Sequence, residues 1–260
     1  MKPTPSCRDL VEGMTPLLAG FDRMWEHFSK KEAMRHVSFA APIDLCRLYF
    51  SELVAKWADA HPGITFDIRP EATADDVRNG LVDVAVINYV PLDATGLVLR
   101  RYNSSRTPLL ATPEYIRAHG APSSPEDLAQ HTGLLLRTVN LNPVRRLYRD
   151  GIESEILEWK NVFITHDQIA LKELLLEDRG IAVDLSLAHV VEELESGRIV
   201  SVMPGWERAP WRMCVVTLRE REEACPPLRL FAEAVALRTG EDWIAYTERG
   251  RAAIARAGTP

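Results

Sequence analysis

Three residues that directly follow the first predicted strand, Pro42, Ile43 and Asp44, could bind a small molecule. They stand where a helix is expected to begin, and a helix N-terminus offers free backbone N–H groups and the positive end of the helix dipole. That combination suits a carboxylate or another anion. Asp44 has a second possible role, because aspartate is strongly preferred as a helix N-cap. If Asp44 caps its own helix, part of the anion site is already filled.

Polar residues also follow two other predicted strands. Asn88 ends the third strand, and Arg137, Thr138 and Asn140 follow a strand in the second half of the chain. Threonine and asparagine side chains hydrogen-bond ligands, and an arginine can hold a carboxylate through two parallel hydrogen bonds. Arg137 could equally be a solvated or salt-bridged surface residue. We expect these four side chains to contact the ligand.

A third group could support either binding or catalysis. Thr165 and His166 follow one strand, and Asp184 follows another. Together with Asp44, the pair His166 and Asp184 could carry out acid–base chemistry, and Cys46 could act as a thiol. Sequence spacing does not tie these residues to one another, and a cysteine within a helix is commonly buried. The sequence holds no nucleotide-binding glycine motif, nucleophile elbow or zinc spacing, so we predict neither a cofactor nor a metal.

The composition is that of a globular protein with no preference for nucleic acid. The chain has 260 residues, of which 46% are hydrophobic and 26% charged, which is enough apolar material for two small lobes. Its net charge is −6, whereas a surface that binds nucleic acid is normally basic. The four cysteines lack metal or redox spacing, and neither a leader peptide nor a membrane-length apolar segment occurs. We therefore expect a cytoplasmic protein that does not bind nucleic acid or membranes directly.

A helix is predicted over residues 8–28. Its apolar residues recur in steps of four and three, which is a heptad pattern and favours a dimerisation helix. They are Leu10, Met14, Leu17, Phe21, Met24 and Phe28. The alternative is an amphipathic helix that packs on its own domain. Pro16 lies within the segment and should kink it or mark a restart.

The rest of the chain alternates between strands and helices. The first series has strands at 37–41, 64–68 and 84–87, with helices at 44–60 and 74–79 between them. The second series has strands at 134–136, 162–164, 181–183, 199–202 and 213–218, and helices at 168–176, 187–194 and 227–237. The tail from Gly240 is polar and is expected to be partly loose. This order predicts an α/β protein of two lobes, with ligands bound in a cleft outside the carboxyl ends of the strands.

Three blocks resemble the sensing half of LysR-type transcriptional regulators. They read LVAKWADAHPGITFDIRPEATADDVRNGLVDVAV from Leu53, LLATPEYIRAHGAPSSPEDLAQH from Leu109 and DRGIAVDLSLAHVVEELESGRIVSVMPGW from Asp178. The resemblance covers about residues 8–238. It implies two Rossmann-like lobes of the type 2 periplasmic binding protein fold, and an effector that is a small organic acid, amino acid or aromatic metabolite.

The resemblance also implies a division of the chain. Residues 1–35 would form a linker or dimerisation helix, residues 36–111 plus 217–238 lobe one, residues 112–216 lobe two, and residues 239–260 a C-terminal tail. Regulators of this family begin with a winged helix-turn-helix, but only seven residues precede the predicted helix here. We therefore expect a chain without a DNA-reading domain, either through truncation or through loss of that domain.

The chain departs from the family pattern in its third block. Asp178 stands where the family has a glycine, and Asp184-Leu185 replaces a Leu-Pro pair. The replacement puts an acid at a strand end that should face the cleft. With Asp44, it predicts a cleft more acidic than is usual in the family, which weakens the expectation of an anionic effector.

Our main hypothesis is therefore an effector-binding domain that acts as a homodimer or higher oligomer. Residues 8–28 and the lobe surfaces would form the contacts, and the effector would signal by rearranging the dimer. The alternative hypothesis is a stand-alone enzyme that evolved from this fold and uses Asp44, His166 and Asp184. An extracytoplasmic solute-binding protein is disfavoured, because we find no signal peptide.

Overall fold

The computed structural model describes residues 4, 11, 13–16, 36–103 and 107–257. Of the helix predicted over residues 8–28, it describes only Val11 and residues 13–16, which are helical, and the rest of that prediction lies outside the described residues. The chain divides into two compact units. Unit 1 comprises Met1–Arg101 and Met213–Arg238, and unit 2 comprises Tyr102–Arg212 and Thr239–Pro260.

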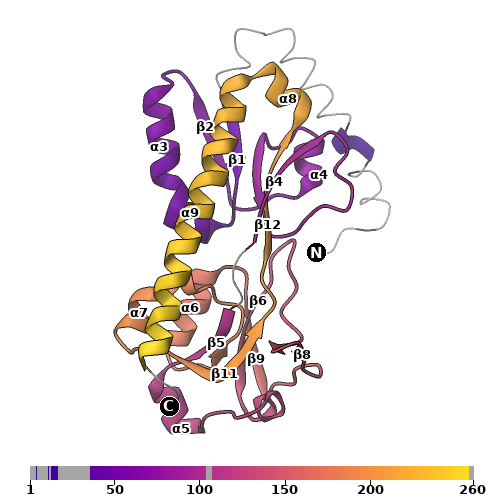
Figure 1. The fold of residues 1–260 in the computed structure, drawn as a ribbon. Helices are drawn as coiled ribbons and strands as arrows, with labels where there is room; N and C mark the ends of the chain where they lie inside the picture. The colour runs from indigo at the N-terminus through magenta and orange to yellow at the C-terminus, as the bar shows by residue number, and fades with distance from the viewer. Residues whose placement is uncertain (1–3, 5–10, 12, 17–35, 104–106, 258–260) are drawn as a thin grey trace. The chain divides into compact units, whose positions relative to one another are not determined.

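Unit 1 is built on a five-stranded sheet of order β2-β1-β3-β12-β4. Strand β1 pairs in parallel with β2 and β3, and β12 runs antiparallel to β3. The strands are β1 His36–Ala40, β2 Thr65–Arg69, β3 Val84–Ile87, β4 Leu97–Asn103 and β12 Arg212–Leu218. The helices are α2 Ile43–Leu45, the π-helical turn η1 Cys46–Phe50, α3 Ser51–Ala60, α4 Ala74–Arg78 and α8 Arg219–Ala224 (Figure 1). Helix α9, Pro226–Ala257, belongs to unit 1 as far as Arg238.

Aromatic rings fill the core on one face of the unit 1 sheet. Phe39 of β1 meets Phe50 and Phe231 edge-on, with ring centroids 5.2 and 5.5 Å apart. Trp57 of α3 lies 5.5 Å from the same Phe231 of α9. Helices α3 and α9 consequently lie side by side over this face (Figure 1). Such ring pairs add to the free energy gained from burying the apolar area itself.

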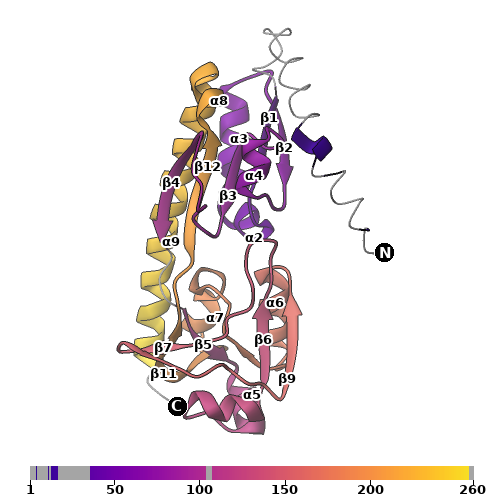
Figure 2. The ribbon, with the colours of Figure 1, turned by 90° about the vertical axis from the view of Figure 1, so that its right-hand side faces the viewer.

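Unit 2 is built on a seven-stranded sheet of order β8-β7-β11-β5-β10-β6-β9. Strand β6 pairs in parallel with β10 and with β9, and β6 and β9 lie side by side in Figure 2. The strands are β5 Thr107–Ala111, β6 Thr132–Leu136, β7 Tyr148–Arg149, β8 Ile152–Glu153, β9 Asn161–Thr165, β10 Ile181–Ala182 and β11 Val200–Arg208. The helices are α5 Pro113–His119, η2 Pro125–Gln130, α6 Gln168–Leu176, η3 Leu187–His189, α7 Val191–Glu195 and the rest of α9.

The unit 2 sheet is buried on both faces at its strand β6. Leu134 and Leu136 of β6 belong to one apolar cluster, and Leu135 between them belongs to the other. Successive side chains of a strand point to opposite faces, so a continuous apolar run is what a strand covered on both sides requires. The α/β fold with two sheets that was predicted from the sequence is confirmed.

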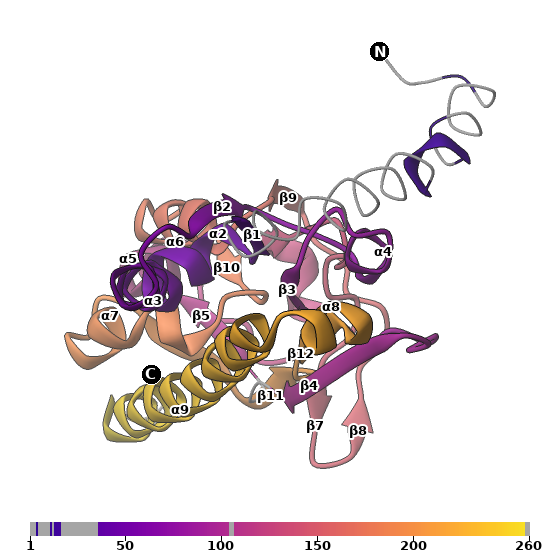
Figure 3. The ribbon, with the colours of Figure 1, turned by 90° about the horizontal axis from the view of Figure 1, so that it is seen from above.

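The structure divides the chain differently from the expected lobe boundaries. Strand β5 was expected in lobe one, but it pairs with β10 and β11 in the sheet of unit 2. The tail from Gly240 was expected to be partly loose, but α9 continues through it to Ala257 and belongs to unit 2. Ala253 is buried in the core there, and Arg249 pairs with Glu195 of the neighbouring α7 (Figure 3). No helix in the described part of the chain is long and apolar enough to cross a membrane.

Candidate functional site

The candidate residues of unit 1 follow two neighbouring strands. Pro42, Ile43 and Asp44 come after β1, and Asn88 comes directly after β3. The two strands run in parallel, with Ala40 opposite Ala85, so their carboxyl ends reach the same edge of the sheet. Ile43 is 53% exposed and Asn88 is half-buried. The expected adjacency of these loops within the unit is therefore present.

Asp44 is not the N-cap of its helix, which corrects one of its two expected roles. Pro42 occupies the N-cap position, and its carbonyl oxygen accepts from the N–H groups of Leu45 and Cys46 at 2.9 and 3.0 Å. Asp44 lies in the first turn, where a carboxylate suits the helix dipole, and only 3% of its surface is exposed. Pro42 has non-helical backbone angles, φ −47° and ψ 135°, between the end of β1 at Ala40 and the first helical residue, Ile43. Asp44 therefore does not make the outer surface of the site acidic.

The thiol of Cys46 is a poor nucleophile in this structure. Burial and, to a smaller extent, the nearby charge of Asp44 raise the pKa of its thiol to about 11. Its Sγ donates to the carbonyl oxygen of Ala41 at 3.6 Å. Because the thiolate is the nucleophile, a thiol with such a pKa is almost fully protonated at neutral pH.

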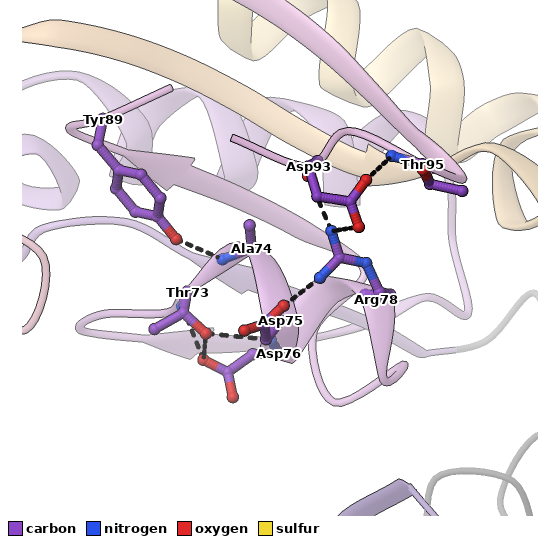
Figure 4. A network of polar contacts seen from close by, with 8 residues as sticks. All are labelled: Thr73, Ala74, Asp75, Asp76, Arg78, Tyr89, Asp93 and Thr95. Carbon is purple, nitrogen blue, oxygen red and sulfur yellow. Dashed lines mark hydrogen bonds and ion pairs between the residues drawn. The ribbon is translucent and has the colours of Figure 1, made fainter. Parts of the chain in front are cut away.

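Tyr89, the residue after Asn88, turns toward helix α4. Its hydroxyl oxygen accepts from the backbone N–H of Ala74 at 2.9 Å (Figure 4). The first turn of α4 is also capped by Thr73, which exchanges hydrogen bonds with Asp76 in a capping box. Tyr89 thus fixes the segment after β3 against α4, and its hydroxyl is used within unit 1.

The candidate residues of unit 2 lie at the ends of three adjacent parallel strands. Arg137, Thr138 and Asn140 follow β6, Thr165 and His166 lie at the end of β9, and Asp184 follows β10. Leu136 is opposite Thr165, and the N–H of Arg137 continues the ladder by donating to the carbonyl oxygen of Thr165 at 2.9 Å. The structure therefore brings these residues to one edge of the unit 2 sheet, as the strand order requires.

A tight turn presents the residues that follow β6. The N–H of Thr138 donates to the carbonyl oxygen of Leu141 at 2.9 Å, and the N–H of Asn140 donates to the Thr138 hydroxyl at 3.3 Å. Arg137 and His166 are exposed, and Thr138 and Asn140 are half-buried. The hydroxyl of Thr165 donates to the carbonyl oxygen of Asp167, which caps helix α6. The exposed candidates of unit 2 are therefore Arg137 and His166.

Asp184 does not present a free carboxylate, contrary to the acidic surface expected from the sequence. It has no exposed area, and its Oδ2 accepts from the N–H groups of Leu136 and Val144, both at 3.2 Å. Its Oδ1 lies 3.1 Å from Nε of Arg208, without the alignment of a hydrogen bond, so this contact is an ion pair. Burial raises the pKa of the Asp184 carboxyl, and Arg208 with the two amides acts against that rise. The acid is therefore neutralised inside unit 2.

Arg208 was missed at the sequence level. Its guanidinium is buried, stacks on Trp211 at 4.1 Å from the ring centroid, and has its pKa lowered by burial. Gln168 was missed as well, and its side-chain oxygen accepts from the N–H of Ser186 at 2.6 Å. Arg208 ends a strand far from Asp184 in the chain, so no pattern of spacing could have paired the two residues.

The geometry of unit 2 separates two of the proposed catalytic groups. His166 is exposed, whereas Asp184 is fully buried and paired with Arg208. A general acid and base that act on one substrate need to reach the same reacting atoms. What the edge of the sheet offers instead is a set of hydrogen-bond donors and one exposed cation, which suits binding of a polar small molecule.

Known proteins resemble this chain over most of its length. A family model of the LysR substrate binding domain matches residues 30–238. The probable HTH-type transcriptional regulator SinR of Salmonella typhimurium is 23% identical over 197 residues, which cover 75% of this chain and 62% of SinR. An HTH-type transcriptional regulator of Xanthomonas campestris is 27% identical over 173 residues, covering 65% of this chain and 49% of that protein. The chain thus spans less than two thirds of these relatives.

A solved structure of similar fold is the regulatory domain of CrgA, a LysR-type transcriptional regulator from Neisseria meningitidis. Its TM-score is 0.60 at 23% identity, with 77% of this chain and 96% of that domain covered. The full-length virulence activator AphB of Vibrio cholerae has a TM-score of 0.64 at 21% identity, with 91% of this chain and 80% of AphB covered. At these identities the two structures establish the fold.

Proposed function

Because this chain belongs to the LysR substrate-binding domain family, we propose that its strand-end loops bind the small-molecule effector of a LysR-type transcriptional regulator. In unit 1, binding is proposed at the loops of Pro42, Ile43, Asp44 and Asn88, and in unit 2 at the polar residues that follow β10, β6 and β9. After β6 and β9 these are Arg137, Thr138, Asn140, Thr165 and His166, whereas the fully buried Asp184 after β10 would act only by holding the N–H groups of Leu136 and Val144. Control of transcription through the effector is part of the same proposal, since the relatives that are longer than this chain are transcriptional regulators.

The observation that carries the proposal is the convergence of polar residues at the ends of three adjacent strands of unit 2. Arg137 is exposed at this edge, and Thr138 and Asn140 follow it in one tight turn. Since Arg208 already neutralises Asp184, that acid does not repel an anion. The effector that fits best therefore carries a carboxylate, which Arg137 would hold, with hydroxyl or carbonyl groups near Thr138 and Asn140.

The proposal is tested with a panel of small aromatic and aliphatic carboxylic acids, each paired with its primary amide as a neutral analogue. Isothermal calorimetry should find acids that bind more tightly than their amides. Arg137→Gln should weaken the binding of such an acid roughly tenfold, because a hydrogen bond to a charged group is lost. The matched control is Arg145→Gln, an exposed arginine of the same unit.

Two outcomes would contradict the proposal. If Arg145→Gln weakens binding as much as Arg137→Gln, the effect is one of overall charge and not of a site. If the bound compound is recovered chemically altered, the chain is an enzyme, and the alternative based on Asp44, His166 and Asp184 takes precedence.

We also propose that the chain forms homodimers through the edges of its sheets. Edge strand β9 exposes Val162, Phe163 and Ile164, each by between 39% and 48%, and edge strand β2 exposes Ile68 by 47%. An exposed apolar edge strand invites association, and a second copy of the chain would cover it. The heptad pattern of residues 8–28 would add to the same assembly, and this part stays a prediction.

The dimer proposal is tested by sedimentation equilibrium. Phe163→Lys should shift the chain toward the monomer, because it places a charge within the apolar edge. Ile156→Lys is the matched control, since Ile156 of unit 2 is 47% exposed, much like Phe163, and lies outside the strands. A Phe163→Lys variant that associates as strongly as the unchanged chain would refute this interface.

A further inference from the structure

A cavity of about 370 Å³ lies within unit 2, between β11 and the last turns of α9. Its volume falls in the range of pockets that bind small molecules. Pro108 of β5 lines one side, and Ile254 and Ala255 of α9 line another. The cavity is distinct from the strand-end site, because none of the residues proposed there lines it.

A bulge in strand β11 forms one wall of this cavity. The pairing of β11 with β5 shifts register between Val202 and Glu207. Within the bulge, Met203 and Gly205 have positive backbone angles φ of 52° and 84°. The side chains of Met203 and Trp206 are buried in the core, so the bulge is held in place while Gly205 lines the cavity. A non-glycine residue in this strained conformation persists only where the surroundings fix it, and such residues cluster at ligand sites.

Another wall is formed by the last part of α9. Ala253 is buried among the leucines of unit 2, and a methyl group added to Gly250 would lie 3.0 Å from Cβ of Leu187. Helix α9 therefore lies close against Leu187 of η3 at Gly250, one turn before Ile254. The wall belongs to the segment after residue 238, beyond the part of the chain that matches the family model.

The polar groups of the cavity form a charge pair and a hydroxyl. Nη2 of Arg251 lies 3.1 Å from Oε1 of Glu207, and Glu207 is only 18% exposed. Ser201, which carries a hydroxyl group, also lines the cavity. A ligand whose only charge is a carboxylate would be attracted by Arg251 but repelled by Glu207. A ligand whose only charge is an ammonium group would be attracted by Glu207 but repelled by Arg251. A ligand with both charges, opposed to those of the pair, gains from both.

We propose that this cavity is a binding site for a free α-amino acid with an apolar side chain. The ammonium group binds Glu207, the carboxylate binds Arg251 and the Ser201 hydroxyl, and the side chain lies on Pro108, Ile254 and Ala255. The two charges of an α-amino acid are separated by two bonds, which matches the close spacing of the Arg251–Glu207 pair. Hydrogen bonds between charged groups supply the selectivity, and the apolar walls supply contact area.

The test uses L-leucine and L-phenylalanine as probes in isothermal calorimetry with the full chain. Each probe is compared with two analogues that lack one charge: 4-methylpentanoate and 3-methylbutylamine for leucine, 3-phenylpropanoate and phenethylamine for phenylalanine. We expect at least one amino acid to bind at least about tenfold more tightly than both of its analogues. Failure of both amino acids to bind, or equal binding of an amino acid and its carboxylate analogue, overturns the proposal.

Variants assign the binding to this cavity. Glu207→Gln should abolish the preference for the amino acid over its carboxylate analogue, because the repulsion of the carboxylate is removed. Glu195→Gln is the matched control, since Glu195 forms the neighbouring ion pair with Arg249 of α9 outside the cavity. Ala255→Phe should fill the cavity and eliminate binding. Amino-acid binding that survives Ala255→Phe but is lost in Arg137→Gln belongs to the strand-end site, and this outcome also overturns the proposal.

Discussion

The buried ion pair of Asp184 and Arg208 leads to a sharp prediction about the stability of unit 2. Replacing Asp184 with alanine removes the acceptor of two backbone N–H groups, those of Leu136 and Val144, and the counter-charge of Arg208. Water cannot substitute easily, because Asp184 has no exposed surface and Arg208 is 6% exposed. All three donors are left buried without their partner.

The expected loss of stability follows from these contacts. A buried amide without an acceptor costs about 1–3 kcal/mol, and removing one partner of a buried ion pair costs about 3–5 kcal/mol. Because the contacts share one carboxylate, these costs overlap, and we expect a loss of about 3–5 kcal/mol. Asp184→Asn keeps an oxygen that the amides can use, so its loss should be smaller. Adding Arg208→Met to Asp184→Ala should recover part of the loss, since the unpaired charge is gone.

The measurement is urea unfolding combined with hydrogen exchange of the β6 and β11 amides, which reports on unit 2 alone. The control is Glu114→Ala at the exposed Arg117 pair of α5, where we expect a change within about 0.5 kcal/mol. If Asp184→Ala costs no more than this control, the carboxylate does not satisfy the three donors. If the double variant is as unstable as Asp184→Ala, the unpaired guanidinium is not the source of the loss.

Three further predictions concern single positions. Gly180→Ala should lower the urea midpoint of unfolding, because the added Cβ would lie 2.3 Å from the backbone carbonyl oxygen of Thr132. An unchanged midpoint would show that the backbone shifts there at little cost. Cys46 should react with iodoacetamide in the folded chain at a rate that keeps rising through about pH 10, since its thiol has a pKa of about 11, and a rate that levels off near pH 8 would refute this. Burial lowers the pKa of His131, so the folded chain binds fewer protons than the unfolded chain. The free energy of unfolding should therefore be highest above pH 6.5, the ordinary pKa of histidine, and fall as the pH drops below it. His131→Phe should reduce this dependence of the urea midpoint on pH.

The regular elements were predictable because their apolar periodicity is strong. Strand β3, Val84–Ile87, is entirely apolar and entirely buried, and helix α6 begins at an aspartate cap, Asp167. The second half of α9 escaped prediction for a physical reason. Its residues buried in unit 2 include Thr247, Gly250 and Ala253, which are small or polar and carry little hydrophobic pattern. Their fit depends on close approach of the helix to unit 2, which the sequence does not reveal.

The candidate site was predictable in position but not in its charges. Parallel strands place their following loops at one edge, so residues such as Arg137 and Thr165 could be grouped from strand order alone. The charge state of the site depends on Arg208, which approaches Asp184 only through the tertiary fold. A second departure from the family pattern, Asp178, has a positive φ of 56°, the conformation for which glycine is favoured, and its carboxylate accepts from the Thr112 hydroxyl.

The division of the chain within α9 has a consequence for the order in which the protein is made. Unit 1 needs residues up to Arg238, and unit 2 needs the segment from Thr239 that brings Ala253 into its core. During synthesis from the N-terminus, unit 1 has all its residues before unit 2 does, even though strands β5 to β11 have already left the ribosome. Until the last stretch of helix is made, the apolar strands of unit 2 lack part of their cover, and such exposed strands are prone to aggregation.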